Sequence, residues 1–245
     1  MSTKPVRVKE GVGPSLNRER VIAAALEIID TEGLDAFSIR GLAQNLGVYP
    51  TAIYWYVPSR NAVLAGVVAE VLNNVTPEQD DVWTEWLRAL FRNFRRQVRR
   101  HPNVAPLIGA QLVSNSSIDF QMIDCILAKL EGAGFRGESL RHAYNTVITT
   151  MGSFVTHELA PRPSETAENW QEELRATIHS VDPDNYPTIS RHLPHLENRA
   201  FIVRWQNGVD VPLDGSFEFF IDAVLRGLLQ VSRESEAAEA GRAKH

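Results

Sequence analysis

The chain has 245 residues, of which 44% are hydrophobic and 22% are charged, and its formal net charge is −5. This length and apolar content allow one large domain, or a small domain and a medium one, with a sizeable buried core. The mild acidity excludes a uniformly basic nucleic-acid coat protein, although it is compatible with a local DNA-binding face.

Cysteine usage and hydropathy exclude further classes. Cys125 is the only cysteine, so an intrachain disulfide and a cysteine-based zinc or iron–sulfur site are excluded. No window approaches the run of roughly 18 apolar residues that crosses a bilayer, and the first residues lack the apolar core of a signal peptide. We therefore expect a cytoplasmic protein with no membrane partner and no cofactor.

Residues 1–15 show no periodicity and contain Lys4, Arg7 and Lys9 among Pro and Gly. We expect a flexible basic arm here. The alternative to a merely disordered leader is an arm that contacts DNA phosphates or the minor groove.

A first helix is predicted to begin after Asn17, which is a favourable N-cap, and to end at Gly33. Residues 38–57 then predict two short helices joined by a tight turn at Gly47, where glycine enters the left-handed conformation without steric cost. Pro50 is tolerated in the first turn of the second helix. Crossed helices of this kind, the second rich in exposed hydroxyl and aromatic groups, are typical of a DNA-binding helix-turn-helix.

The next pattern predicts a helix over 59–73 with Ser59 as its N-cap. A stretch with Pro and acidic residues over 76–81 follows and marks a boundary. We therefore expect a DNA-binding domain at 16–73 and a second domain at 74–232.

Apolar spacing predicts the helices of the second domain. They are expected at 83–100, 118–131 and 138–159, with shorter helices at 168–180 and 187–202. A last helix, capped by Asp214 or Ser216, is expected at 216–232, and a disordered polar tail at 233–245.

An arginine stripe follows one face of the helix predicted at 83–100. Its members recur at helical spacing and are Arg88, Arg92, Arg95 and Arg99. We interpret them as a solvated face paired with nearby acids. The alternative is a site for an anion or for the carboxylate of a ligand.

The segments VIAAALEIIDTEGLDAFSIRGLAQNLGV and TAIYWYVPSRNAVL resemble the DNA-binding domain of the tetracycline-repressor family of bacterial transcription regulators. The resemblance implies an all-α fold, with an N-terminal three-helix helix-turn-helix domain and a larger helical effector-binding and dimerisation domain. It also implies a homodimer that binds a double-stranded DNA operator.

The same resemblance implies which residues contact DNA. Arg40 would contact a base or phosphate from the first motif helix, and Pro50 and Thr51 would begin the recognition helix. The full set of predicted DNA-contacting residues is Arg40, Tyr49, Pro50, Thr51, Tyr54, Trp55, Tyr56 and Arg60. These types suit the task, because Arg can fork onto guanine, hydroxyls donate to phosphates and rings pack on thymine methyls or sugars.

Two helices predict a dimer, because those at 138–159 and 216–232 are apolar over more than one face, which a monomer would leave in water. In the resembling family, the corresponding helices pair with their copies as a four-helix bundle. A two-fold dimer would place one DNA-binding domain on each half-site of a palindrome.

An effector cavity is predicted between the helices at 83–100 and 138–159, although each residue there also suits a plain core. The predicted lining residues are Trp86, Leu90, Phe94, Tyr144, Met151 and His157. Tetracycline-binding members of the family coordinate a drug-bound magnesium through histidine, whereas this chain has Leu107 and Ile108 in that region. We therefore expect an apolar or aromatic effector and no metal site.

The predicted function is a homodimeric repressor that an effector releases from a palindromic operator. One alternative is a DNA-binding dimer without a small-molecule effector. A remote alternative is a metal-dependent enzyme whose metal ligands would be His179, His192, His195 and Glu197. It is remote because the sequence shows neither a phosphate-binding loop nor a nucleophile paired with a base. In addition, His157-Glu158 lacks the second histidine of a zinc-protease helix.

Overall fold

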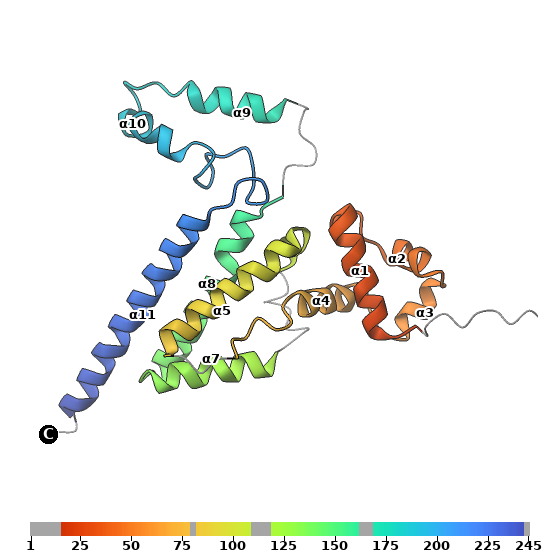
Figure 1. Ribbon diagram of the computed structural model, residues 1–245, viewed down its shortest axis with the longest axis horizontal. Coiled ribbons are helices and arrows are strands. Elements are labelled where there is room, and N and C mark those ends of the chain that lie inside the picture. Colours follow the sequence, from red (N-terminus) through yellow and green to blue (C-terminus); the bar gives the residue numbers. More distant parts are fainter. Residues whose placement is uncertain (1–15, 79–81, 109–118, 162–168, 243–245) are drawn as a thin grey trace, which may run out of the picture. The chain divides into compact units, whose positions relative to one another are not determined.

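The computed structural model describes residues 16–78, 82–108, 119–161 and 169–242 (Figure 1). Within these ranges the chain forms helices and no β-strand, which confirms the predicted all-α class. The predicted arm at 1–15 lies outside the described residues. None of the helices in the described ranges combines the length and the apolar content that crossing a membrane requires.

The chain divides into two compact units, Met1–Leu64 and Ala65–His245. The first contains α1 (Arg18–Glu32), α2 (Ile39–Leu46), α3 (Pro50–Tyr54) and the beginning of α4 (Arg60–Val71). Fully buried side chains at Ile29, Leu42 and Ile53 form its core. Hydrophobic burial of this kind fixes α1, α2 and α3 on one another.

The predicted helix ends of the first unit are confirmed. The Asn17 side chain accepts a hydrogen bond from the Arg20 amide at 2.8 Å, and Ser59 Oγ accepts one from the Ala62 amide at 3.1 Å. Gly47 has φ 67° and ψ 32°, the left-handed conformation expected at the turn between α2 and α3.

The second unit contains the rest of the helices of the described residues. They are α5 (Trp83–Arg100), η1 (Pro102–Val104), α7 (Phe120–Gly132), α8 (Gly137–Glu158), α9 (Trp170–His179), α10 (Pro187–Leu196) and α11 (Asp214–Arg242). Helices α5, α7 and α8 pack pairwise, and α11 lies along α5 and α8 (Figure 1). Fully buried side chains in this bundle include Leu90, Phe91, Ile126 and Ile221.

Two helix ends differ from the prediction. Helix α10 ends at Leu196 and does not reach 202, because Asn198 (φ 56°) and Ile202 (φ 74°) adopt left-handed backbone conformations. Helix α11 continues to Arg242, so the structure corrects the predicted disordered tail that far. The extension is rich in Ala, Glu and Arg, which are strong helix formers.

Candidate DNA-binding surface and effector cavity

Helix α3 and the residues next to its two ends present an aromatic surface, and the buried Ile53 anchors the helix. Ile53 is fully buried, whereas Tyr49 and Trp55 leave 83% and 87% of their surface exposed. Tyr54 and Tyr56 are also exposed. Exposed rings of this number on so short an element leave apolar surface in water, which marks an interaction site.

The other predicted DNA-contacting residues lie on the same unit. Arg40, Pro50 and Thr51 are exposed. The Arg60 guanidinium lies 5.5 Å from the centre of the Phe37 ring, and its Nη2 donates to the Phe37 carbonyl at 3.5 Å. Arg60 therefore also anchors the start of α4 to the turn before α2.

The residues predicted to line a cavity mostly lie in the core of the second unit. Trp86, Leu90 and Phe94 of α5 and Met151 of α8 are buried. Tyr144 is half-buried, and burial raises the pKa of its phenol above the usual value. Of the six predicted residues, His157 lines a cavity at the end of α8.

This cavity has a volume of about 470 Å³ and lies between the end of α8, Trp170 of α9 and the loop 201–207. Aromatic rings from Trp170, Phe201 and Trp205 line it together with His157. The Phe201 ring packs edge-on against Phe154, with ring centres 5.4 Å apart. Concave, mainly apolar cavities of several hundred cubic ångströms are typical of sites for small molecules.

Arg204 contributes a cation to the cavity wall. Its Nη2 donates to the backbone carbonyl of Glu158 at 3.0 Å and to that of His157. Burial lowers the pKa of Arg204 because the charged form loses hydration, and the negative charge of Glu158 opposes this shift.

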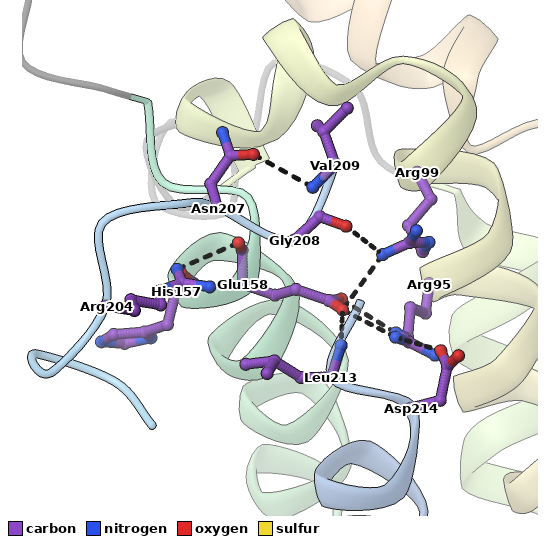
Figure 2. Close-up of polar contacts among 10 residues, drawn as sticks. All are labelled: Arg95, Arg99, His157, Glu158, Arg204, Asn207, Gly208, Val209, Leu213 and Asp214. Atoms are coloured by element: carbon purple, nitrogen blue, oxygen red, sulfur yellow. Dashed lines mark hydrogen bonds and ion pairs between the residues drawn. The ribbon is translucent and has the colours of Figure 1, made fainter. Parts of the chain in front are cut away.

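The Glu158 carboxylate joins three helices beside the cavity (Figure 2). It is fully buried and accepts hydrogen bonds from Arg95 at 2.7 and 2.9 Å, from Arg99 at 3.1 Å and from the Leu213 amide at 3.0 Å. Burial acts to lower the pKa of Arg95, but its bonds to Glu158 and Asp214 prevail and raise it. The cluster therefore ties α5 and α8 to the start of α11.

The arginine stripe is thus only partly as predicted. Pairing with acids is confirmed, since Arg88 binds Asp222 and Arg92 binds Glu218. The prediction of a solvated face is wrong at Arg95, because this side chain is buried and forms an ion pair with Glu158. The sequence analysis does not predict that Glu158 is the buried partner of Arg95. The one feature that indicates such a role is an acidic residue at the apolar C-terminal end of a predicted helix.

Gly208 approaches this cluster more closely than a larger residue could. Its amide donates to the Glu158 carbonyl at 2.7 Å, and its carbonyl accepts from Arg99 at 2.8 Å. A Cβ at this position would lie 2.2 Å from Glu158 Cγ and 2.9 Å from the Glu158 carbonyl oxygen. The missing side chain is therefore what lets the loop before α11 close on α8.

Gly208→Ala should lower the free energy of unfolding by about 1–3 kcal/mol, because the added methyl forces the loop or Glu158 out of place. Urea denaturation followed by circular dichroism measures this change. The control is Gly215→Ala in α11, where a Cβ meets nothing within 4 Å, and which should be neutral or stabilising by up to about 1 kcal/mol. Equal losses in both variants would contradict the steric account.

The residues named for a metal-dependent enzyme do not form a ligand cluster. His179 Nε2 and Glu197 Oε1 lie 2.5 Å apart. The described residues contain no group of three or more His, Cys, Asp or Glu side chains that could hold a metal ion.

Two family models match the chain. Residues 21–67 match "Bacterial regulatory proteins, tetR family", and residues 76–232 match "Tetracyclin repressor-like, C-terminal domain". The tetracycline repressor protein class D of Escherichia coli is 30% identical over 183 residues, which cover 69% of this chain and 82% of that protein. A helix-turn-helix transcriptional repressor of Mycobacterium tuberculosis is 26% identical over 234 residues, or 92% of this chain and 85% of its own.

Solved structures share the fold. ActR from Streptomyces coelicolor has a TM-score of 0.65 at 24% identity, over 90% of this chain and 98% of that chain. BioQ, solved with its double-stranded DNA operator, has a TM-score of 0.56 at 24% identity, over 67% of this chain and 97% of that chain.

The chain has a helix-turn-helix unit followed by a larger helical unit, and both family models that it matches describe DNA-binding transcription regulators. The chain belongs to the tetracycline-repressor family of bacterial regulatory proteins. Its relatives are transcriptional regulators, as the sequence resemblance implied.

Proposed function

We propose that the protein is a homodimeric repressor, acting in the cytoplasm on a palindromic operator, from which a small aromatic effector releases it. The observation that carries the proposal is the exposed aromatic and hydroxyl surface of α3 around the buried Ile53. A short helix that is anchored by one apolar side chain and exposes the rest is suited to lie in the major groove.

Mapping the DNA that the purified protein protects from cleavage tests the proposal. We expect one or more protected palindromes, and addition of the effector should abolish the protection. A protein that protects no specific sequence would contradict DNA regulation, whereas protection unaffected by any member of a panel of aromatic compounds would favour a dimer without a small-molecule effector.

The aromatic cavity of the second unit supports an aromatic effector. Trp170, Phe201 and Trp205 offer flat apolar surfaces. Leu107 and Ile108 are buried apolar side chains and offer no ligand to a drug-bound metal, so we do not propose tetracycline as the effector. ActR, which shares the fold, has been solved in complex with actinorhodin.

An exposed face of α11 supports the homodimer. Four uncharged residues at intervals of four, Phe219, Ala223, Gly227 and Val231, are exposed along this helix. A Cβ on Gly227 would meet nothing within 4 Å, so this face has space for a neighbour. Small residues between two larger apolar ones allow a second helix to approach closely, and a copy of the same face satisfies a two-fold contact.

Helix α4 is the proposed link between effector and operator. The boundary between the two units falls within it, between Leu64 and Ala65, so a movement of its C-terminal half can be passed to its N-terminal half. Effector binding would favour dimers whose recognition helices no longer match the half-site spacing. A coupling of ~1–3 kcal/mol changes operator occupancy by one to two orders of magnitude.

The division of labour on the DNA surface predicts two distinct mutant phenotypes. Tyr54→Ala should weaken binding to matched and mismatched operators about equally, because a tyrosine hydroxyl on a phosphate carries no base information. Arg40→Ala should cost about 1–3 kcal/mol and also relax base preference. Fluorescence anisotropy with both operators measures this, and an equal loss on the two DNAs for Arg40→Ala would refute its role as a base reader.

A further inference from the structure

Within the part of the chain that the structure describes, Arg204 carries a buried hydrogen-bond donor that has no partner. Its Nη1 is inaccessible to solvent and makes no hydrogen bond, whereas its Nη2 is held by the carbonyls of Glu158 and His157. Buried donors are nearly always paired in folded proteins, so an unpaired one calls for an explanation. One explanation is an acceptor that arrives from outside the chain.

The surroundings of this donor indicate what the acceptor is. The Arg204 guanidinium lies 5.4 Å from the centre of the Phe201 ring, and both residues line the cavity at the end of α8. Among the described residues, the lining includes three aromatic rings besides His157 and no Asp or Glu. The described wall therefore combines flat apolar surfaces with the positive charge of Arg204, on which the Glu158 carboxylate acts from outside the lining.

We infer that this cavity binds a flat aromatic acid, whose rings pack against Trp170, Phe201 and Trp205 and whose anionic oxygen accepts a hydrogen bond from Arg204 Nη1. This inference rests on the proposed function and specifies the chemical class of its effector. A charged acceptor makes a stronger hydrogen bond to a guanidinium than a neutral one. Binding also brings a second negative charge, besides that of Glu158, to a cation whose hydration is reduced by burial.

Because Nη1 is buried, the acid reaches it only when the loop 201–207 shifts. Ile202 favours such a shift, since it is β-branched, has φ 74° and leaves 95% of its surface exposed. The backbone of this segment is therefore strained and few contacts hold its side chain. The loop leads directly to Gly208, which is bonded to Glu158 and Arg99, so its movement acts on the contacts among α5, α8 and α11.

The test uses two probes that differ in one group, 9-anthracenecarboxylate and the neutral 9-anthracenemethanol. Titration of the purified full-length protein without DNA, by calorimetry and by quenching of tryptophan fluorescence, gives the two dissociation constants. We expect the acid to bind about tenfold or more tightly than the alcohol, because the alcohol offers no charged acceptor. Equal affinity of the two probes, or binding of neither, would overturn the inference.

Variants assign the preference to the guanidinium. Arg204→Met keeps an apolar stem and should bind both probes equally, whereas Arg175→Met should keep the preference for the acid. Arg175 is a fair control because its guanidinium lies 5.5 Å from the Trp205 ring but is exposed. If Arg204→Met kept the preference, the inference would be wrong.

Phe201→Ala provides a second test that is independent of the arginine. Loss of this ring should weaken binding of both probes by about tenfold or more, and unchanged affinities would place the probes elsewhere and overturn the inference. Operator protection is measured separately with the same preparations. A protein that binds its operator but neither probe would contradict the aromatic-acid site while leaving the proposed DNA regulation intact.

Discussion

Glu158→Gln should lower the free energy of unfolding by about 3–5 kcal/mol, the largest loss of stability that we expect from a single change in this chain. The carboxylate is fully buried, and the Arg95 side chain that it holds is 10% exposed. Removing the negative charge leaves the Arg95 guanidinium buried beside a neutral amide, with Asp214 as its remaining acid. Urea denaturation followed by circular dichroism measures the loss.

The matched control is Glu218→Gln. Glu218 also accepts two hydrogen bonds from one arginine, Arg92, at 2.6 and 2.9 Å. The side chains of Arg92 and Glu218 are 51% and 43% exposed, so water can replace the lost contact and the expected cost is below about 1 kcal/mol. If the two variants lost the same stability, burial would not be what makes Glu158 important.

A double variant separates the pair from its surroundings. Arg95→Met combined with Glu158→Met removes both charges at once, so no buried ion is left without a partner. We expect the double variant to lose less stability than the sum of the two single variants. Additive losses would mean that the two side chains act independently.

The helix-turn-helix could be read from the sequence because its determinants are local. Asn17 caps a helix through the amide of Arg20 three residues later, and Gly47 ends another by its own backbone conformation. Apolar spacing within one helix then identifies Leu42 as core. None of these features depends on a residue far away in the chain.

The Glu158 cluster could not be read in this way, because its partners are distant. Arg95 and Arg99 lie on α5, and Leu213 lies just before α11. Periodicity places the arginines on a polar stripe, and charged residues are seldom buried unless paired. Without the tertiary fold, the pattern therefore predicts that the stripe faces solvent. The identity of the buried acid depends on how α8 packs against α5.

Most of the lining of the cavity at the end of α8 cannot be predicted from the sequence, for a different reason. Its loop 201–207 has no periodic pattern, and the left-handed conformations of Asn198 and Ile202 occur without the glycine that usually signals them. The Asn198 side chain instead holds the loop, since its Oδ1 accepts from the Trp205 and Gln206 amides at 3.3 and 3.2 Å. Apolar spacing is strongest on α5 and α8, so the predicted lining residues come from those two helices.

Phe219→Glu should convert the proposed dimer into a monomer and weaken operator binding by about a hundredfold or more. The side chain is 78% exposed on α11, so the change costs a monomer little, whereas in a two-fold contact each copy would bury an unpaired carboxylate. Binding two half-sites with linked DNA-binding domains gains about 10²–10⁴ in affinity over one domain. Sedimentation velocity and anisotropy with the operator measure the two effects.

Phe120→Glu is the matched control, because Phe120 of α7 is 74% exposed and the chemical change is the same. It should leave both the oligomeric state and operator affinity unchanged. If Phe219→Glu remained a dimer, the α11 face would not be the contact. If it became a monomer yet bound the operator as tightly as the wild type, the two DNA-binding domains of a dimer would not bind cooperatively. The proposed release through a changed separation of the recognition helices would then be wrong.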